Sequence, residues 1–249
     1  MSLDNISIVL VRTSHGGNIG AVARAMANMG FSDLRLVEPA KFPAPEATAR
    51  AVGAVTILES AKVFGSLDEA ISDSGLVVGA TARLRTVSWP TLTPHNAMQE
   101  AAKTCKSHKV SLVFGKESSG LTNEELDRAQ RHVRIPVEEK YPSLNLAAAV
   151  LILCYEARRA YIESAVHSNE TITNFPPLAT GEQVQKFFSH LELVLKKIGF
   201  IQSPSSKLFR KIKRIFSRTP LQQQEVNILR GILASIENNQ QSSVNQKEH

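Results

Sequence analysis

The run Ile6-Ser7-Ile8-Val9-Leu10-Val11 is followed, three residues later, by His15-Gly16-Gly17-Asn18-Ile19-Gly20-Ala21-Val22-Ala23-Arg24. The apolar run predicts a buried strand, and the glycine-rich segment predicts a loop that opens a helix. The N-terminus of such a helix offers unpaired N–H groups to an anion, and the long side chain of Arg24 leans back toward it. This segment is therefore either a ligand-binding loop or an ordinary strand-to-helix turn with Arg24 in a surface ion pair.

Apolar runs alternate with helix-start signals up to about residue 163, which indicates an α/β fold. Several of the runs are apolar on both faces, so we expect a mostly parallel sheet flanked by helices. The expected strands are residues 6–11, 34–37, 55–58, 76–79, 110–114 and 133–135. Helix starts are expected after Ser66, at Thr93-Pro94 and at a capping box that begins with Thr122.

Residues 144–162 predict a helix that is apolar almost all round, with Ser143 as its N-cap, so this helix is either buried or part of a subunit interface. A polar, proline-containing segment follows and is typical of a linker. Three helical segments and a Gln-, Asn- and Ser-rich end complete the chain. We expect an α/β domain of residues 1–165, a linker of residues 166–180, a small all-α domain of residues 181–238 and a disordered tail of residues 239–249.

Positive charge is concentrated toward the C-terminus. Of the net charge of +6, residues 1–165 contribute +1 (18 Lys and Arg against 17 Asp and Glu) and residues 166–249 contribute +5 (11 against 6). Segment 207–218 places apolar residues on one helical face and cations on the other, which suits RNA, a membrane surface or solvent. We favour RNA, because the segment lies within a folded helical unit. Arg83 and Arg85 either meet phosphate or remain solvated. The candidate RNA contacts in the basic segment are Lys207, Arg210, Lys211, Lys213 and Arg214.

The chain lacks the signals of several common protein classes. Its longest apolar stretch, residues 146–155, is about half the length that crosses a bilayer, and we expect neither a signal peptide nor a membrane partner. The two cysteines and seven histidines have no metal-ligand spacing, which predicts no bound metal and a reducing, cytoplasmic location. The motifs of phosphate-loop, dinucleotide, serine-hydrolase and zinc-protease sites are absent from the sequence.

Four segments follow predicted strands with small or polar residues, at the strand ends where α/β proteins bind ligands. They are residues 15–24, 79–83, 115–121 and 141–146. Glu117 orients Arg24, caps its own loop or accepts a proton, and we favour orientation or capping. Ser143 and Asn145 either serve a site or only cap the next helix.

Together these blocks resemble the SPOUT family of RNA 2'-O-methyltransferases, and within it the bacterial tRNA (cytidine/uridine-2'-O-)-methyltransferases. The likeness covers nearly the whole chain, and motifs of this length are specific. The matching segments are residues 10–26, 112–126, 143–147 and 227–237. Pro142 departs from the family pattern, which has serine there, and stiffens the backbone.

The resemblance implies a deep trefoil knot at the C-terminal end of the α/β domain, S-adenosylmethionine bound in the knot, and a homodimer. It implies methyl transfer to the ribose 2'-OH of nucleotide 32 in a tRNA anticodon loop. It places in the cofactor site Ala80, Thr81, Ala82, Gly115, Ile135, Ser143, Leu144 and Asn145. It assigns to catalysis Asn18, Arg24, Glu117, Ser143 and Asn145, and Arg24 is also expected to contact RNA.

Methylation of a ribose hydroxyl requires alignment with the methyl donor and removal of one proton. The family view makes Arg24 the general base, although a free guanidinium keeps its proton above about pH 12. We therefore expect Arg24, held by Glu117 or Asn18, to stabilise the developing alkoxide and a neighbouring phosphate. The alternatives are the same chemistry on ribosomal RNA and a non-catalytic RNA-binding protein of the same fold.

Overall fold

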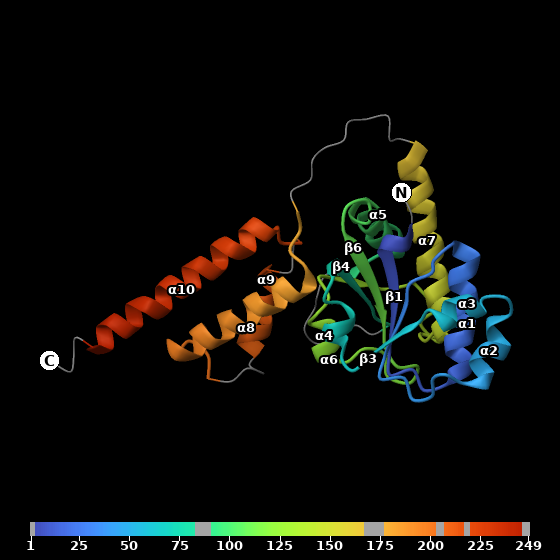
Figure 1. Ribbon diagram of the computed structural model, residues 1–249, viewed down its shortest axis with the longest axis horizontal. Coiled ribbons are helices and arrows are strands. Elements are labelled where there is room, and N and C mark those ends of the chain that lie inside the picture. Colours follow the sequence, from blue (N-terminus) through green and yellow to red (C-terminus); the bar gives the residue numbers. More distant parts are fainter. Residues whose placement is uncertain (1–2, 83–90, 167–176, 203–206, 217–219, 246–249) are drawn as a thin grey trace.

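The structure, a computed structural model, describes residues 3–82, 91–166, 177–202, 207–216 and 220–245 (Figure 1). Its centre is a seven-stranded sheet in the order β3-β2-β1-β6-β4-β7-β5, in which all neighbours are parallel. The strands are β1 (Ile6–Val11), β2 (Leu34–Val37), β3 (Lys62–Phe64), β4 (Ser74–Ala80), β5 (Thr91–Leu92), β6 (Lys109–Phe114) and β7 (Arg131–Val133). The predicted α/β class with a parallel sheet is confirmed.

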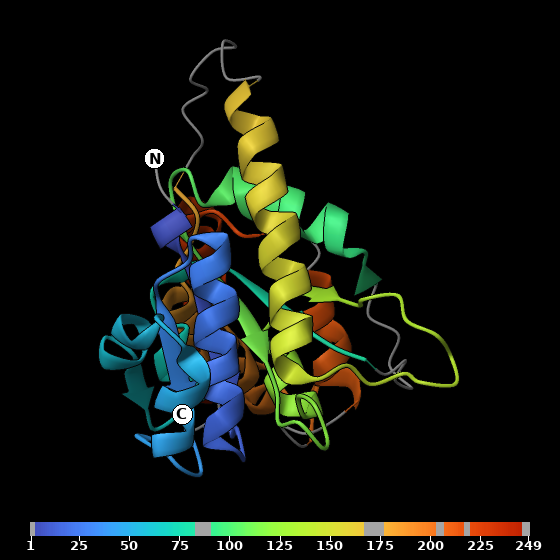
Figure 2. The same cartoon turned by 90° about the vertical axis from the view of Figure 1, so that its right-hand side faces the viewer.

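Helices cover both faces of this sheet, because the side chains of its strands alternate between two apolar cores. The helices are α1 (Gly16–Met29), α2 (Pro45–Ala51), α3 (Val55–Glu59), α4 (Leu67–Ala70), α5 (Pro94–Thr104), α6 (Asn123–Leu126) and α7 (Leu146–Val166), and a 3-10 turn (Leu3–Asn5) precedes β1. Ile6, Ile8 and Leu10 of β1 face α1, α5 and α7, which lie together in Figure 2. Val9 and Val11 face α4 and α6 on the other side.

The close packing of α1 on α2 explains one glycine of the opening motif. A Cβ atom on Gly20 would lie 2.0 Å from the carbonyl oxygen of Ala47, so only glycine allows the two helices to approach so closely. Gly20 is therefore required for the packing of α1 on α2.

The predicted helix starts are confirmed by their caps. The hydroxyls of Ser66, Thr93 and Thr122 each accept a hydrogen bond from a backbone N–H in the first turn of α4, α5 and α6. The predicted strand at 55–58 is wrong, since these residues form α3. A run of four apolar residues has no period that separates a strand from one buried helical turn, and the edge position of the sheet is taken by β3 instead.

The C-terminal helices form a separate apolar core on the α4 and α6 side of the sheet (Figure 1). They are α8 (Gly181–Lys197), α9 (Lys207–Phe216) and α10 (Gln223–Asn245). Phe187, Phe188 and Phe216 pack ring against ring at the centre, with centroids 5.1 to 6.4 Å apart. The last helix continues to Asn245, through part of the segment that the sequence predicts to be disordered. None of the helices that the structure describes is long and apolar enough to span a membrane.

A buried arginine ties β2 to the start of β4. The Arg35 guanidinium, 3% exposed, donates to Asp33, Asp73 and the Ala70 carbonyl at 2.6 to 3.1 Å. Burial would raise the pKa of the Asp73 carboxyl, but the hydrogen bonds and charges of Arg35 and Lys109 outweigh it and lower this pKa to about 2. Asp73 is therefore ionised in the folded protein at neutral pH.

We expect Asp73→Asn to lower the free energy of unfolding by about 1–2 kcal/mol at pH 7, a value discounted because the Asp73 side chain is 42% exposed. The folded pKa lies below the unfolded one, so the contribution is complete above about pH 4 and is lost as the pH falls toward 2. Urea unfolding of both proteins at pH 7 and pH 3 measures this, with Glu59→Gln as a surface control. A difference that is equal at both pH values would contradict it.

Candidate functional site

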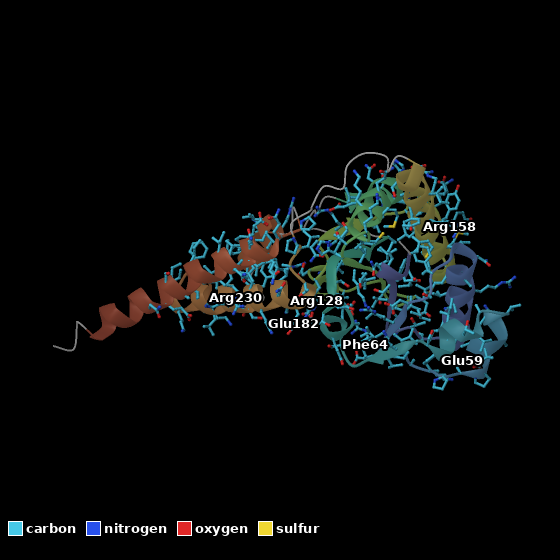
Figure 3. All side chains as sticks on the ribbon, turned by 45° about the horizontal axis from the view of Figure 1, so that its top comes forward. Glu59, Phe64, Arg128, Arg158, Glu182 and Arg230 are labelled. Carbon is cyan, nitrogen blue, oxygen red and sulfur yellow. The ribbon has the colours of Figure 1, made fainter. Side chains whose placement is uncertain are left out.

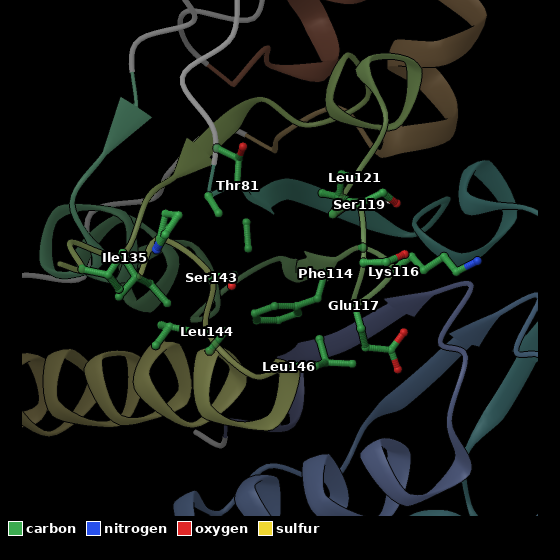
Figure 4. Close-up of a pocket in the computed structure, with 18 of the residues that line it drawn as sticks. Thr81, Phe114, Lys116, Glu117, Ser119, Leu121, Ile135, Ser143, Leu144 and Leu146 are labelled. Carbon is green, nitrogen blue, oxygen red and sulfur yellow. Dashed lines mark hydrogen bonds between the residues drawn. The ribbon is translucent and has the colours of Figure 1, made fainter. Parts of the chain in front are cut away.

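A cleft lies at the carboxyl ends of β4, β6 and β7, where three of the four segments expected to bind a ligand meet (Figure 4). In Figure 4, Thr81, Phe114 and Ser143 surround one space, and Glu117 lies at its edge toward β1 and α1. The lining residues are Ala80, Thr81, Ala82, Phe114, Gly115, Lys116, Glu117, Ser118, Ser119, Gly120, Leu121, Val133, Ile135, Val137, Pro142, Ser143, Leu144, Leu146 and Ala149. The cleft is thus mostly apolar with a few polar groups, as small-molecule sites usually are.

The structure brings seven of the eight expected cofactor residues into this cleft, and Asn145 is the exception. The Asn145 side-chain oxygen instead accepts the backbone N–H of Ala147 at 2.9 Å, at the start of α7. The prediction of Ser143 as N-cap is therefore wrong: α7 begins two residues later than the apolar pattern indicates, and Ser143 is left free to face the cleft.

The loop of residues 115–121 folds back tightly on itself beside the cleft. The Gly120 N–H donates to the Lys116 carbonyl at 2.7 Å, and Gly120 has a φ of 68°. A Cβ on Gly115 would lie 2.1 Å from the Gly120 carbonyl carbon and 2.2 Å from the Leu121 nitrogen. Only glycine at 115 therefore permits the bend that presents this backbone to a ligand.

Glu117 joins this loop to the opening motif. Its carboxylate accepts the Asn18 side-chain amide at 2.8 Å and the backbone N–H groups of Ser14 at 3.0 Å and His15 at 3.5 Å. Burial would raise the pKa of the Glu117 carboxyl, but these hydrogen bonds outweigh it and lower the pKa below its ordinary value. A carboxylate held ionised by three donors is suited to orienting a loop and poorly suited to accepting a proton near neutral pH.

Arg24 lies apart from this network. It is exposed on α1, six residues and roughly 9 Å along the helix axis beyond Asn18. Within the described part of the chain it has no ion pair or hydrogen bond to Glu117 or Asn18, so the expectation that one of them holds it is not met in this single chain. Arg83 and Arg85 lie outside the described residues.

The candidate RNA-binding cations of α9 fall into two groups. Lys207 and Lys211 are exposed, and Arg214 is partly exposed. Arg210 donates to the Asp127 carboxylate at 2.9 and 3.2 Å, and the Lys213 ammonium lies over the rings of Phe188 and Phe209. The helical period predicts the two faces of α9 only in part. Leu208 and Ile215, expected on the apolar face, are 43% and 58% exposed, and two of the expected cations meet the rest of the protein.

One ion pair near the site has no sequence signal. Arg12 follows the end of β1 with a φ of 51° and pairs with Glu125, the last residue of the α6 capping box, while Glu38 lies 3.9 Å away. Phe114, Leu121 and Leu146 also line the cleft and were not predicted from the sequence to do so, although they lie within the matching segments 112–126 and 143–147. Among the residues that the structure describes, no three His, Cys, Asp or Glu side chains gather as metal ligands would.

Comparisons with known proteins agree with the motifs. The model of the SpoU rRNA methylase family matches residues 5–155, and that of the tRNA methyltransferase TrmJ C-terminal domain matches residues 182–247. The chain is 44% identical to the tRNA (cytidine/uridine/adenosine-2'-O-)-methyltransferase TrmJ of Pseudomonas aeruginosa, and the alignment covers 93% of each chain. It is 42% identical to the tRNA (cytidine/uridine-2'-O-)-methyltransferase TrmJ of Escherichia coli K12, and that alignment covers 99% of this chain and 100% of the relative.

A solved structure supports the same assignment. The crystal structure of TrmJ from Zymomonas mobilis ZM4 superimposes with a TM-score of 0.80 at 33% identity, covering 93% of this chain and 98% of the other. The match extends over both the α/β domain and the C-terminal helices. The chain belongs to the SpoU (SPOUT) methylase family and carries the C-terminal domain that is characteristic of TrmJ.

Proposed function

We propose that the protein transfers a methyl group from S-adenosylmethionine to the ribose 2'-OH of nucleotide 32, a cytidine or uridine, in tRNA anticodon loops. The supporting observation is the convergence of the segments around Thr81, Gly115 and Ser143 on one cleft, beside the Glu117 network. The near full-length relatives are named as tRNA 2'-O-methyltransferases. A trefoil knot formed by these segments, and a cytoplasmic location beside the tRNA pool, belong to the same proposal.

The residues of the cleft fit the cofactor. The tight bend at Gly115 exposes backbone groups, Val133, Ile135 and Leu144 provide apolar walls, and Thr81 supplies a hydroxyl at the rim. When bound, S-adenosylmethionine supplies a methyl group already activated on a sulfonium. The chain then has to orient the ribose, exclude water and stabilise charge on the reacting oxygen.

Asn18 and Glu117 act in this proposal as the orienting pair. Glu117 fixes the Asn18 amide and the backbone before α1, and this places the opening motif against the cofactor loop. The role of Ser143 is at the cleft, where its hydroxyl faces the reacting groups, and Asn145 sets where α7 begins.

Arg24 acts as a charge clamp for the alkoxide that develops on the ribose and for a neighbouring phosphate. A guanidinium holds its proton far above neutral pH and presents five donors, so it stabilises an oxyanion more readily than it accepts a proton. The proton leaves late in the reaction, to phosphate or water. Because Arg24 is exposed on α1, it is open to an RNA substrate.

Labelled S-adenosylmethionine and total RNA, followed by mapping of the modified nucleotide, test the proposed function. We expect a 2'-O-methyl group at tRNA position 32. Gly115→Ala should abolish transfer and weaken cofactor binding by more than about tenfold, because the new Cβ would occupy the Leu121 backbone. Gly231→Ala, on an open face of α10, is the matched control. Label in ribosomal RNA, or cofactor-independent RNA binding without transfer, would favour the alternative functions.

Arg24→Lys separates a charge clamp from a general base. If Arg24 is a charge clamp, Arg24→Lys should be more active than Arg24→Ala. Its activity should still stay about 10- to 100-fold below that of the wild type at every pH, because the compact charge of lysine cannot replace the planar, multidentate guanidinium. Single-turnover methylation between pH 7 and 10, with tRNA affinity measured alongside, reports this. Full recovery of the lysine variant at high pH with ordinary tRNA affinity would identify residue 24 as the base.

We propose that the exposed cations Lys207 and Lys211 of α9, together with the partly exposed Arg214, contact the tRNA backbone. Arg83 and Arg85, which lie outside the described residues, remain candidate RNA contacts on the sequence alone. Phosphate contacts give affinity and register without reading sequence, which suits an enzyme that must place a whole tRNA against one small cleft. The domain that carries these cations also holds most of the net positive charge of the chain.

A homodimer through α7 is part of the proposal. Leu151, Tyr155 and Ile162 are 36%, 52% and 50% exposed, respectively, although another face of the helix, with Val150, Leu153 and Ala157, packs in the core. Leu144, which lines the cleft, is also exposed, by 38%. A second copy would cover this apolar face and approach the open side of the cofactor cleft.

Tyr155→Glu should convert the protein from a dimer to a monomer of 27.2 kDa, because a carboxylate in the apolar contact would be desolvated. Sedimentation equilibrium measures the molar mass. Leu193→Glu on α8, a similarly exposed apolar site outside α7, serves as the control and should remain dimeric. A wild-type protein that sediments at 27.2 kDa would contradict the dimer.

A further inference from the structure

Two cations on α9 face inward rather than toward solvent. The Arg210 guanidinium makes a two-point contact with the Asp127 carboxylate, at 2.9 and 3.2 Å, and the two side chains are 23% and 11% exposed. A paired guanidinium that is largely shielded from water is poorly placed to neutralise a tRNA phosphate.

Lys213 reinforces this inward side. Its ammonium lies 5.5 Å from the Phe188 ring centroid and 5.2 Å from the Phe209 centroid, inside the C-terminal core. Burial is the largest cause that lowers the pKa of the Lys213 amine, and the nearby positive charge of Arg128 adds to it. Phe209 thus packs in the C-terminal core, and Arg210 and Lys213 beside it lie where this core meets the α/β domain at Asp127 and Arg128.

Asp127 belongs to a part of the α/β domain that is itself firmly held. It caps the C-terminus of α6, which directly follows the cofactor loop of residues 115–121. On one side Glu125 pairs with Arg12 beyond the end of β1, and on the other Arg128 donates to Asp68 at 2.6 and 3.1 Å. A contact to Asp127 therefore fixes the position of α9 relative to the edge of the proposed methyl-transfer site.

Other contacts between the domains, among the residues that the structure describes, gather at the entrance of α8. The backbone N–H of Leu178 donates to His108 at 2.9 Å, and that of Glu182, which is labelled in Figure 3, donates to the Ser72 carbonyl at 3.1 Å. A cavity of about 260 Å³ lies between α8 on one side and the ends of α4 and α6 on the other, so apolar packing between the two domains is not continuous there. The contacts at the start of α8 alone would let the helical domain pivot about that point. The ion pair of Arg210 with Asp127 is a second attachment, away from the first, and it prevents this rotation.

We propose that Arg210 is a positioning residue: its ion pair with Asp127, supported by Lys213 on the aromatic core, holds the helical domain in one orientation so that Lys207, Lys211 and Arg214 present tRNA to the cleft. This inference rests on the proposed contact of those exposed cations with tRNA. Arg210 and Lys213 then act through protein contacts, and their own charges are not the ones that bind phosphate.

Asp127→Asn separates positioning from direct RNA contact. If Arg210 only bound phosphate, loss of the neighbouring carboxylate would leave methylation unchanged or improve tRNA affinity. A positioning role predicts that kcat/KM for tRNA falls about 10- to 100-fold while the Kd for S-adenosylmethionine stays within about twofold. Asp127→Glu keeps the carboxylate and should retain most of the activity. The double variant Asp127→Asn/Arg210→Gln should have a kcat/KM no lower than that of either single variant, because the two side chains act as one pair.

The domain orientation is measured directly by pulsed electron paramagnetic resonance. Spin labels are placed at Glu59→Cys and Arg230→Cys, both exposed and labelled in Figure 3, while the native Cys105 and Cys154 are buried. Labelled protein is mixed with an excess of unlabelled protein, so that in a homodimer the measured distance is the one across the two domains of a single chain. We expect one narrow distribution in the otherwise unchanged protein and in the control Glu182→Gln, whose ion pair with Lys186 stays within α8. Asp127→Asn should broaden it. An unchanged distribution would overturn the proposal, whatever the activity.

A further variant distinguishes failure of this inference from failure of the proposed function. Lys207→Gln/Lys211→Gln/Arg214→Gln should weaken tRNA binding and reduce its salt dependence while leaving the label distance narrow. If this triple variant binds tRNA normally, the proposed RNA surface is wrong, yet the label distance still decides whether Arg210 orients the domain.

Discussion

The parallel sheet imposes the constraint on which the rest of the site depends. In such a sheet all carboxyl ends point to one edge, and the strand order β1-β6-β4-β7 places four of these ends side by side. Segments that are far apart along the chain, around Asn18, Thr81, Gly115 and Ile135, therefore meet there. The central strands β1, β6 and β4 each pair with a neighbour on both sides, so the sheet is a fixed scaffold for the loops at this edge.

Glu117 fixes how two of these loops, the opening motif and the loop of residues 115–121, lie against each other. Three donors from the opening motif converge on its carboxylate, and they keep it ionised. A carboxylate in that state is a structural anchor for Asn18, and the cofactor loop is held on the other side by the bend at Gly115. The loop of residues 115–121 and the opening motif are thus linked through one side chain.

How much of this could be predicted from sequence depends on the kind of signal. Buried strands such as Ile6–Val11 and capped helices such as the one after Thr122 have strong local signals, and they were predicted correctly. The short run at 55–58 has no usable period, and it forms a helix. Seven of the residues expected to bind the cofactor lie in one cleft, because the motifs that contain them follow the ends of neighbouring parallel strands.

The missed features are contacts between segments distant in sequence. Nothing local at Arg12 indicates its pairing with Glu125, and nothing local at Arg210 indicates Asp127, 83 residues away. The sequence by itself determined the parallel α/β fold, the motif loops and the basic C-terminal helices, because each rests on periodicity, caps or glycine at short range. Only the tertiary structure decided which cations of α9 pair with other parts of the protein and which stay exposed, since an ion pair depends on where two surfaces meet after folding.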